Sequence, residues 1–300
     1  MKYTEEENPM AKIPLHRFPG LVDLRIVNSP TITNRVFEVI AENCPLLTHL
    51  EFGGKPDEYN SFISLDGIRI LWGSPDEDKG EYSDEDDVFH ESMGLQSSLQ
   101  TIKIYYWVKV GEQAIELISN RFGDSLKSLW IYRNFNEFSA KITDEALISL
   151  EKWSKLEQLE IVYSRNFDWD WVNYLAIYCK NLKILNLKDC PIQESFEPLA
   201  QGCPFLEELN MSGDSWVKEE ALVGLCKHQN LKIYYLGHFE HGDIDWLEID
   251  EPEKGKFIGK LLSSPSNLPN LEKLFLEKWW LSMYIQDSIM KNREEVEVII

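Results

Sequence analysis

Cysteine and histidine residues, which are ligand types for zinc, gather in one stretch of the sequence. Cys226 and His228 are followed by His238 and His241. Recognised zinc sites pair their ligands at set spacings, and this arrangement matches none of them. We therefore treat zinc binding here as an alternative to a structural role in the fold.

An acidic run at residues 76–91 is a second candidate for metal chemistry. It contains nine Asp and Glu residues, and Asp76, Asp78 and Asp87 fall near ligand positions of a calcium-binding loop. Such a loop needs glycine at its sixth position, where this sequence has Glu81. We favour a solvated acidic loop, with an arm that engages a basic partner as the functional alternative.

Local signatures of catalysis are missing from the sequence. It contains no G-x-S-x-G, G-x-x-x-x-G-K-[ST], G-x-G-x-x-G or H-E-x-x-H motif. Catalytic groups assembled from distant segments would leave no such motif. Because a repeating core leaves few buried clefts, we nevertheless predict that the chain is not an enzyme and uses no cofactor or metal.

The elements that must position any site repeat along the chain. Nine segments contain L-x-x-L-x-L or a close variant: LVDLRI, LLTHLEF, LQTIKI, LKSLWI, LEQLEI, LKILNL, LEELNM, LKIYYL and LEKLFL. We call the first leucine of each motif its anchor; the anchors are Leu21, Leu47, Leu99, Leu126, Leu156, Leu182, Leu206, Leu231 and Leu271. Most intervals are near 26 residues, and the 52-residue gap after Leu47 holds an imperfect echo at Leu65, Ile68 and Ile70.

This spacing predicts strands that alternate with helices. In L-x-x-L-x-L the last two apolar residues lie two apart, so they face one side of a strand. Each strand is followed by a segment such as residues 142–153, where apolar residues recur at helical spacing. Narrow strands beside wider helices make a stack bend. The predicted fold is an α/β solenoid of horseshoe form, with parallel strands on the concave face and helices on the convex face.

The cysteines point to a family. Cys44, Cys179 and Cys203 each stand three residues before an anchor, in NCPLL, YCKNL and GCPFL, while Cys226 and Cys190 lie near others. With ITNRVF and ITDEAL, this pattern resembles the cysteine-containing leucine-rich-repeat family, as in the repeat domains of F-box proteins. The resemblance spans nearly residues 18–280 and implies that the repeats bind substrates for cullin-type ubiquitin ligases. No F-box is found, because the first repeat begins by Leu21.

We predict one leucine-rich-repeat domain over residues 1–300. Its departures from the repeat are an N-terminal cap or tail at 1–17, an acidic insertion with a degenerate repeat at 57–98, a second insertion at 237–256 and a C-terminal cap at 279–300. The final VEVII is expected to add an edge strand to that cap.

Composition limits the partners. The formal net charge of -21 repels phosphate backbones and anionic lipids, so we expect neither nucleic acid nor membrane as a ligand. Five cysteines, no export signal and no long apolar run favour the cytoplasm or nucleus. A basic surface on a protein partner would be attracted, although the charge also simply keeps a solenoid soluble.

The predicted function is that of a protein-interaction scaffold, with a ubiquitin-ligase substrate receptor as the alternative. Residues between the inward leucines face outward on the strands, and large aromatic residues there are expected to be covered by a partner or by a segment of the same chain. The predicted partner-binding residues on the concave face are Lys103, Tyr105, Trp130, Tyr132, Gln158 and Glu160.

Overall fold

The computed structural model describes the greater part of the repeat array. The described residues are 14–28, 34–54, 67, 69, 71, 99–105, 112–132, 149–162, 171–190, 195–213, 219–236, 251–277 and 282–300.

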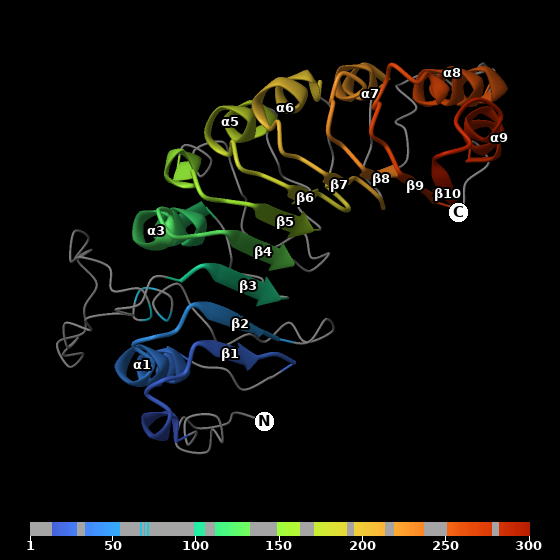
Figure 1. Ribbon diagram of the computed structural model, residues 1–300. Helices are drawn as coiled ribbons and strands as arrows, with labels where there is room; N and C mark the ends of the chain where they lie inside the picture. Colours follow the sequence, from blue (N-terminus) through green and yellow to red (C-terminus); the bar gives the residue numbers. More distant parts are fainter. Residues whose placement is uncertain are drawn as a thin grey trace. The chain divides into compact units, whose positions relative to one another are not determined.

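Short parallel strands form one layer of the structure (Figure 1). They are β1 Asp23–Ile26, β2 His49–Gly53, β3 Thr101–Tyr105, β4 Ser128–Tyr132, β5 Gln158–Val162, β6 Ile184–Asn186, β7 Glu208–Asn210, β8 Ile233–Leu236, β9 Lys273–Leu276 and β10 Glu297–Ile299.

Helices form the other layer and connect one strand to the next. The α-helices are α1 Asn34–Asn43, α3 Glu112–Phe122, α5 Trp171–Tyr178, α6 Glu197–Gly202, α7 Glu219–Leu225, α8 Glu251–Ser263 and α9 Ser282–Asn292, and two 3-10 helices are η3 Leu15–Arg17 and η4 Ser149–Lys152. Parallel strands that alternate with helices along the described residues confirm the predicted α/β leucine-rich-repeat solenoid class.

The chain divides into two compact units. The first comprises Met1–Leu126 with Tyr132–Ala140, and the second Lys127–Ile131 with Lys141–Ile300. Within each unit the strands are consecutive and parallel, so that a strand pairs with the strand of the preceding repeat.

In the first unit, β2 pairs directly with β3, and His49 lies opposite Thr101. The strands before and after the predicted insertion at 57–98 are therefore neighbours in the sheet. Leu65, Ile68 and Ile70, which suggested a degenerate repeat, lie outside the described residues, whereas the neighbouring Leu71 is helical and fully buried.

In the second unit, a helix overlaps the end of the predicted second insertion. Helix α8 begins at Glu251, so the last residues of the predicted insertion at 237–256 are helical and belong to the repeat. The predicted edge strand is confirmed, because β10 pairs in parallel with β9. Of the helix expected at 142–153, the described part is the 3-10 helix η4 with the residue after it.

The core lies between the two layers and is made of the repeated leucines. Seven anchors are completely buried: Leu47, Leu99, Leu126, Leu156, Leu182, Leu206 and Leu231. Residues three and five positions after each of these anchors are also buried, as Leu185 and Leu187 are after Leu182. The predicted inward direction of the motif is thus confirmed. Leu21 is half-buried, because no earlier described strand covers it.

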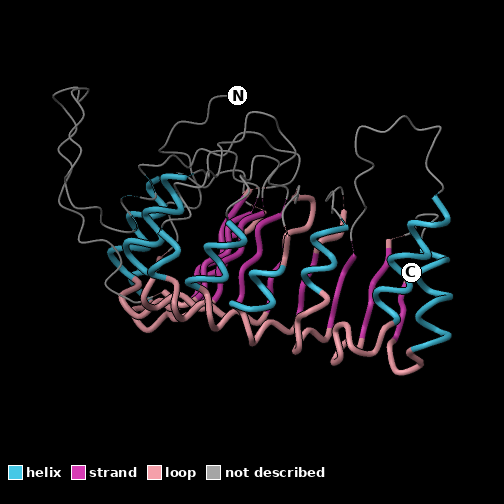
Figure 2. The backbone as a smooth tube through the Cα atoms, turned by 90° about the horizontal axis from the view of Figure 1, so that it is seen from above, coloured by secondary structure: helices cyan, strands magenta, loops and turns pink. Residues whose placement is uncertain are grey.

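Within each unit, the turns from helix to strand lie along one edge of the sheet (Figure 2). In most of these turns the residue three positions before the anchor accepts a hydrogen bond from the anchor's own N–H, as Cys203 does from Leu206 at 3.1 Å. Its N–H donates to the last turn of the preceding helix, as Cys203 does to Leu199 at 2.9 Å. We call this residue the turn residue; its side chain is buried at Cys44, Trp153, Cys179, Cys203 and His228.

Side chains at the turn residue bond to the preceding repeat. The Cys203 thiol lies 3.7 Å from the carbonyl oxygens of Leu175 and Cys179. At the equivalent place His228 is buried, and its Nε2 lies 3.0 Å from the carbonyl oxygen of Cys203. Nδ1 of His228 accepts a hydrogen bond from the Asn230 N–H, so the neutral ring is satisfied on both sides.

Residues next to the anchors repeat a second set of contacts. The residue before the anchor is Asn181, Asn230 or Asn270, and its side-chain amide donates to a carbonyl of the preceding turn at 2.6–2.7 Å. The residue after the anchor alternates in charge through six repeats of the second unit: Lys127, Glu157, Lys183, Glu207, Lys232 and Glu272. Lys183 pairs with Glu157 at 2.7 Å, and Lys232 pairs with Glu207 at 3.1 Å.

Before β10, Arg293 makes the corresponding bonds. This side chain is 1% exposed, and its guanidinium donates to the carbonyl oxygens of Leu262, Asn267 and Leu268 at 3.0–3.4 Å. Its Nε donates to Glu295 at 2.9 Å. A single buried guanidinium thus joins the end of α8, the turn before β9 and the turn before β10.

Replacing Arg293 with Met should lower the free energy of unfolding by about 3 kcal/mol or more, because buried carbonyl groups lose their donor. Urea denaturation measures the effect. Lys291→Met is the control: Lys291 is exposed and pairs with Asp287 one turn away on α9, so this change should cost about 0.5 kcal/mol or less. Equal losses for the two variants would contradict the structural role of Arg293.

The cysteines provide a second test of the core. All five are buried and free, and burial raises the pKa of the Cys203 and Cys226 thiols to about 12. Since the thiolate is the reactive form, we expect the native protein to react very slowly with DTNB and the urea-denatured protein to react at all its thiols. Rapid labelling of the native protein would show that a cysteine is accessible.

Candidate partner-binding surface

The outward face of the strands, the face away from the helices, carries its side chains in rows. Strand register places residues two positions after each anchor in one row and residues four positions after it in another. From β5 to β10 the first row is Gln158, Ile184, Glu208, Ile233, Lys273 and Glu297, and the second is Glu160, Asn186, Asn210, Tyr235, Phe275 and Ile299.

A hydrogen-bond network joins the side chains at the β5 end of these rows. Glu160 is only 7% exposed, and its two carboxylate oxygens accept hydrogen bonds from Gln158 at 2.7 Å and from Asn186 at 3.2 Å. Ser128 donates to Gln158 at 3.3 Å. The predicted pair Gln158 and Glu160 is thus joined into one network over β4, β5 and β6, which holds both side chains in place.

In the first unit, the structure brings two predicted aromatic residues together. The rings of Tyr105 and Tyr132 stack with centroids 5.1 Å apart and planes 26° apart. Both residues are half-buried on the outward face of β3 and β4. Lys103 also points outward from β3, two residues before Tyr105. The proposed recognition residues of this unit are therefore on one face, as predicted.

Trp130 belongs to the second unit, on β4. It is half-buried, and its indole nitrogen is shielded from solvent. The outward direction predicted for Trp130 agrees with the alternating burial of the strand. Its role in binding stays a prediction.

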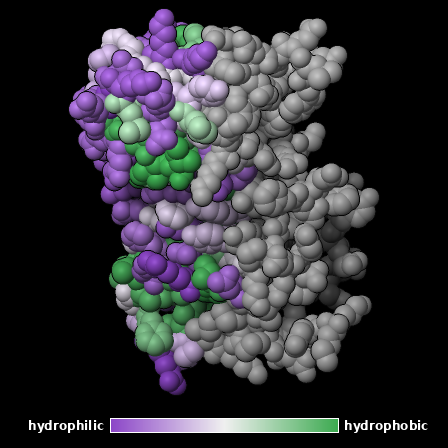
Figure 3. All heavy atoms as spheres, turned by 90° about the vertical axis from the view of Figure 1, so that its right-hand side faces the viewer, coloured by the Kyte–Doolittle hydropathy of each residue, from purple (hydrophilic) through white to green (hydrophobic). Residues whose placement is uncertain are grey.

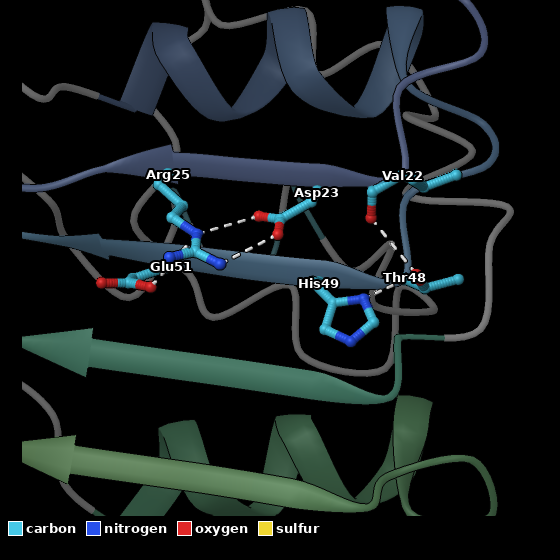
Figure 4. A network of polar contacts seen from close by, with 6 residues as sticks. All are labelled: Val22, Asp23, Arg25, Thr48, His49 and Glu51. Carbon is cyan, nitrogen blue, oxygen red and sulfur yellow. Dashed lines mark hydrogen bonds and ion pairs between the residues drawn. The ribbon is translucent and has the colours of Figure 1, made fainter.

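Charged side chains occupy the outward face of β1 and β2 (Figure 4). Arg25 donates two hydrogen bonds to Asp23, at 3.1 and 3.2 Å, and lies 3.7 Å from a carboxylate oxygen of Glu51. The bond from Arg25 lowers the pKa of Asp23, with smaller contributions from His49 and Lys103. Arg25, Glu51 and Lys103 are aligned by register, so the charges alternate along this row.

One aromatic pair was not among the predicted site residues. The rings of Tyr235 and Phe275 stack at 4.2 Å with planes 9° apart, and both side chains are half-buried on the outward face. Each stands four residues after its anchor. This shared position in consecutive repeats was the available signal, but the sequence does not show that the two rings stack.

Glu208 lies beside this pair on β7, between Ile184 and Ile233 of the neighbouring strands. It is half-buried, and within the described ranges its carboxylate has no hydrogen-bond or ion-pair partner. Burial raises the pKa of Glu208, and the charge of Glu160 raises it further. Burial also raises the pKa of Tyr235, with a contribution from Glu208.

Neither candidate metal site is assembled in the described part of the chain. No group of three or more His, Cys, Asp or Glu residues there could hold a metal ion. Cys226 and His228 serve the core instead, and His238 and His241 lie outside the described residues, as do Asp76, Asp78 and Asp87.

The rest of the described surface offers a contrast with the strand face. Figure 3 shows a view in which hydrophilic residues cover most of the coloured surface and hydrophobic residues form separate patches. Leu46 and Phe205, in turns that lead from a helix to a strand, and Ile177 on α5 are more than half exposed. Within the described ranges, no helix is both long enough and apolar enough to cross a membrane.

No protein-family model matches the sequence. Among solved structures, the chain is similar to an internalin of Listeria monocytogenes, with 13% identity over 96% of this chain and 88% of that one and a TM-score of 0.44. A chain of the yeast Rad7 and Elc1 complex is 16% identical over 94% and 74% of the two chains, with a TM-score of 0.44.

A plant peptide hormone receptor, RGFR1 in complex with RGF2, is 12% identical over 96% of this chain and 40% of the receptor, with a TM-score of 0.44. At these identities and TM-scores, the three similarities carry no argument about function.

Glu208→Gln should raise the free energy of unfolding at pH 7 by about 1 kcal/mol or less, since water screens this half-buried carboxylate. The folded-state pKa is raised, so ionisation costs stability as the pH rises through it, and the cost is absent below the unfolded value near 4.5. The gain should therefore vanish at pH 3. Thermal unfolding at both pH values measures it, and a variant that is destabilised at pH 7 would contradict this account.

Proposed function

We propose that this protein is a non-catalytic scaffold that binds another protein on the outward face of its strands. The observation that carries the proposal is the set of half-buried aromatic side chains on rigid strands, where Tyr105 stacks on Tyr132 and Tyr235 stacks on Phe275. Aromatic residues of this kind dominate the binding energy of many protein interfaces, because a partner removes their large apolar surface from water.

Rigidity supports a binding role. The strands are tied by backbone hydrogen bonds from turn to turn, such as the 2.8 Å bond from the Glu207 N–H to the Lys183 carbonyl oxygen. Residues on such strands are held in place before a partner arrives, so less side-chain freedom is lost on binding. The net charge of -21 favours a partner with a basic surface over nucleic acid or a lipid surface.

A substrate-recognition subunit of a cullin-type ubiquitin ligase is the second candidate. Its support is the resemblance of the cysteine positions to those of F-box repeat domains, together with the burial of Cys44, Cys179 and Cys203 at the turn residue. Purification of the tagged chain from cells, followed by mass spectrometry, separates the two: stoichiometric cullin and adaptor subunits favour the ligase role, and other abundant partners without them favour the scaffold. The free thiols fit a cytoplasmic or nuclear location.

Trp130→Ala tests the binding face. We expect it to weaken the affinity for a captured partner by about 2 kcal/mol or more, because a large ring leaves the interface. Calorimetric titration of the purified pair measures the loss. Phe205→Ala removes an aromatic ring from the turn between α6 and β7, where Phe205 is 56% exposed, and it should leave the affinity unchanged. If Phe205→Ala weakens binding and Trp130→Ala does not, the partner binds near the helix-to-strand turns instead of the outward face of the strands.

A further inference from the structure

Glu208, Ile184, Ile233, Tyr235 and Phe275 lie on four consecutive strands, β6 to β9, on the outward face of the second unit, and we call them the Glu208 subsite. The carboxylate stands in the first row with an isoleucine on each side, and the stacked rings stand in the second row on the two following strands. Four of the five side chains are apolar or aromatic, and all five are half-buried.

In the isolated protein, these surroundings disfavour the charged form of the Glu208 carboxylate. Burial in the row between Ile184 and Ile233 reduces its contact with water, the charge of Glu160 also acts on it, and no described residue donates a hydrogen bond to its carboxylate. Partial desolvation without a partner disfavours the charged form. A cation brought by another molecule would remove this penalty and gain a hydrogen bond strengthened by charge.

The chemistry of the surroundings selects among cations. Lysine carries a compact, strongly hydrated ammonium, which keeps its water and therefore suits an exposed carboxylate. The arginine guanidinium is planar and weakly hydrated, pairs with a carboxylate through two N–H groups, and stacks on aromatic rings. Only the guanidinium can use Glu208, the isoleucines and the Tyr235–Phe275 rings together.

We propose that the Glu208 subsite binds an arginine side chain presented by a segment of the partner protein. The inference rests on the proposed function, since it names the chemistry of the partner and one place where the partner is held. Glu208 pairs with the guanidinium, Ile184 and Ile233 contact the aliphatic part of the side chain, and Tyr235 with Phe275 provides the surface on which the guanidinium stacks.

Peptide selection tests the proposal without a known partner. A phage library of short random peptides is selected on the full chain, and the probes are the synthetic peptides recovered. We expect arginine to be enriched over the unselected library. Replacing that arginine with citrulline, which keeps the shape and removes the charge, should weaken binding about tenfold or more, as should Glu208→Gln in the protein.

A double-mutant cycle then assigns the contact. If arginine binds at Glu208, the citrulline peptide should bind wild type and Glu208→Gln about equally, because the charge pair is already lost. Tyr235→Leu should also weaken the arginine peptide, and it should weaken the lysine analogue less. Glu297→Gln is the matched control, since it removes one charge from the same row at β10, where Glu297 is exposed and pairs with Lys273; its affinity should equal that of wild type.

Three outcomes would overturn the inference: peptides without arginine enrichment, full affinity in Glu208→Gln, or additive losses in the cycle. None of these three outcomes by itself contradicts the proposed scaffold function. Peptides that depend on Trp130 or Tyr105 and not on Glu208 would leave the scaffold proposal standing while the arginine subsite falls. Both proposals would be contradicted if the selected peptides bind every outward-face variant as tightly as wild type. Failure to recover any binding peptide would also count against both.

Discussion

Register between neighbouring strands is the constraint on which the rest of the structure depends. Strands of three to five residues make few ladder bonds of their own, and a slip of one residue would turn every outward side chain into the core. The turns prevent this slip. A buried anchor, a buried turn residue and an asparagine such as Asn181 bond each turn to the one before it. The outward rows form because such contacts recur at the same positions in successive repeats.

Alternating charge at the same turns also favours the correct order of the repeats. The residue after the anchor alternates between lysine and glutamate from Lys127 to Glu272, so each repeat meets the opposite charge on the next. A mispaired array that skipped one repeat would place Lys127 beside Lys183, or Glu157 beside Glu207, and like charges repel. Each exposed pair contributes little by itself, but the alternation penalises one class of wrong stacking at every step. The ion pairs therefore bear more on which repeats pack together than on how stable the stack is.

The fold followed from the sequence because its two signals are local. Anchors near every twenty-sixth residue and alternation within L-x-x-L-x-L are enough to predict inward leucines, parallel strands and the edge strand β10. The turn residue was only partly predictable: cysteine marked it in three repeats, while Trp153 and His228 fill the same place elsewhere, because what the position requires is burial and a bond to the preceding turn. His228 was considered as a zinc ligand because its residue type and its position near Cys226 were the only signals in the sequence. The sequence does not show that the ring is buried against the Cys203 carbonyl. Tyr235 and Phe275 were not chosen as site residues because their shared position places them on neighbouring strands without showing that the rings stack.

A rigid stack can hold a side chain where it is not stable by itself. The backbone of β7 is fixed by β6 and β8, and Leu206 and Leu209 are completely buried beneath it, so the strand cannot turn to expose Glu208. The outward face is therefore free to carry a carboxylate between two isoleucines, at a cost that the core of the repeat offsets. Positions that break a local rule without helping the fold are where function is expected. In a solenoid such positions fall in rows, because every outward residue has a counterpart in the next repeat, and a partner that follows the strands meets one row after another.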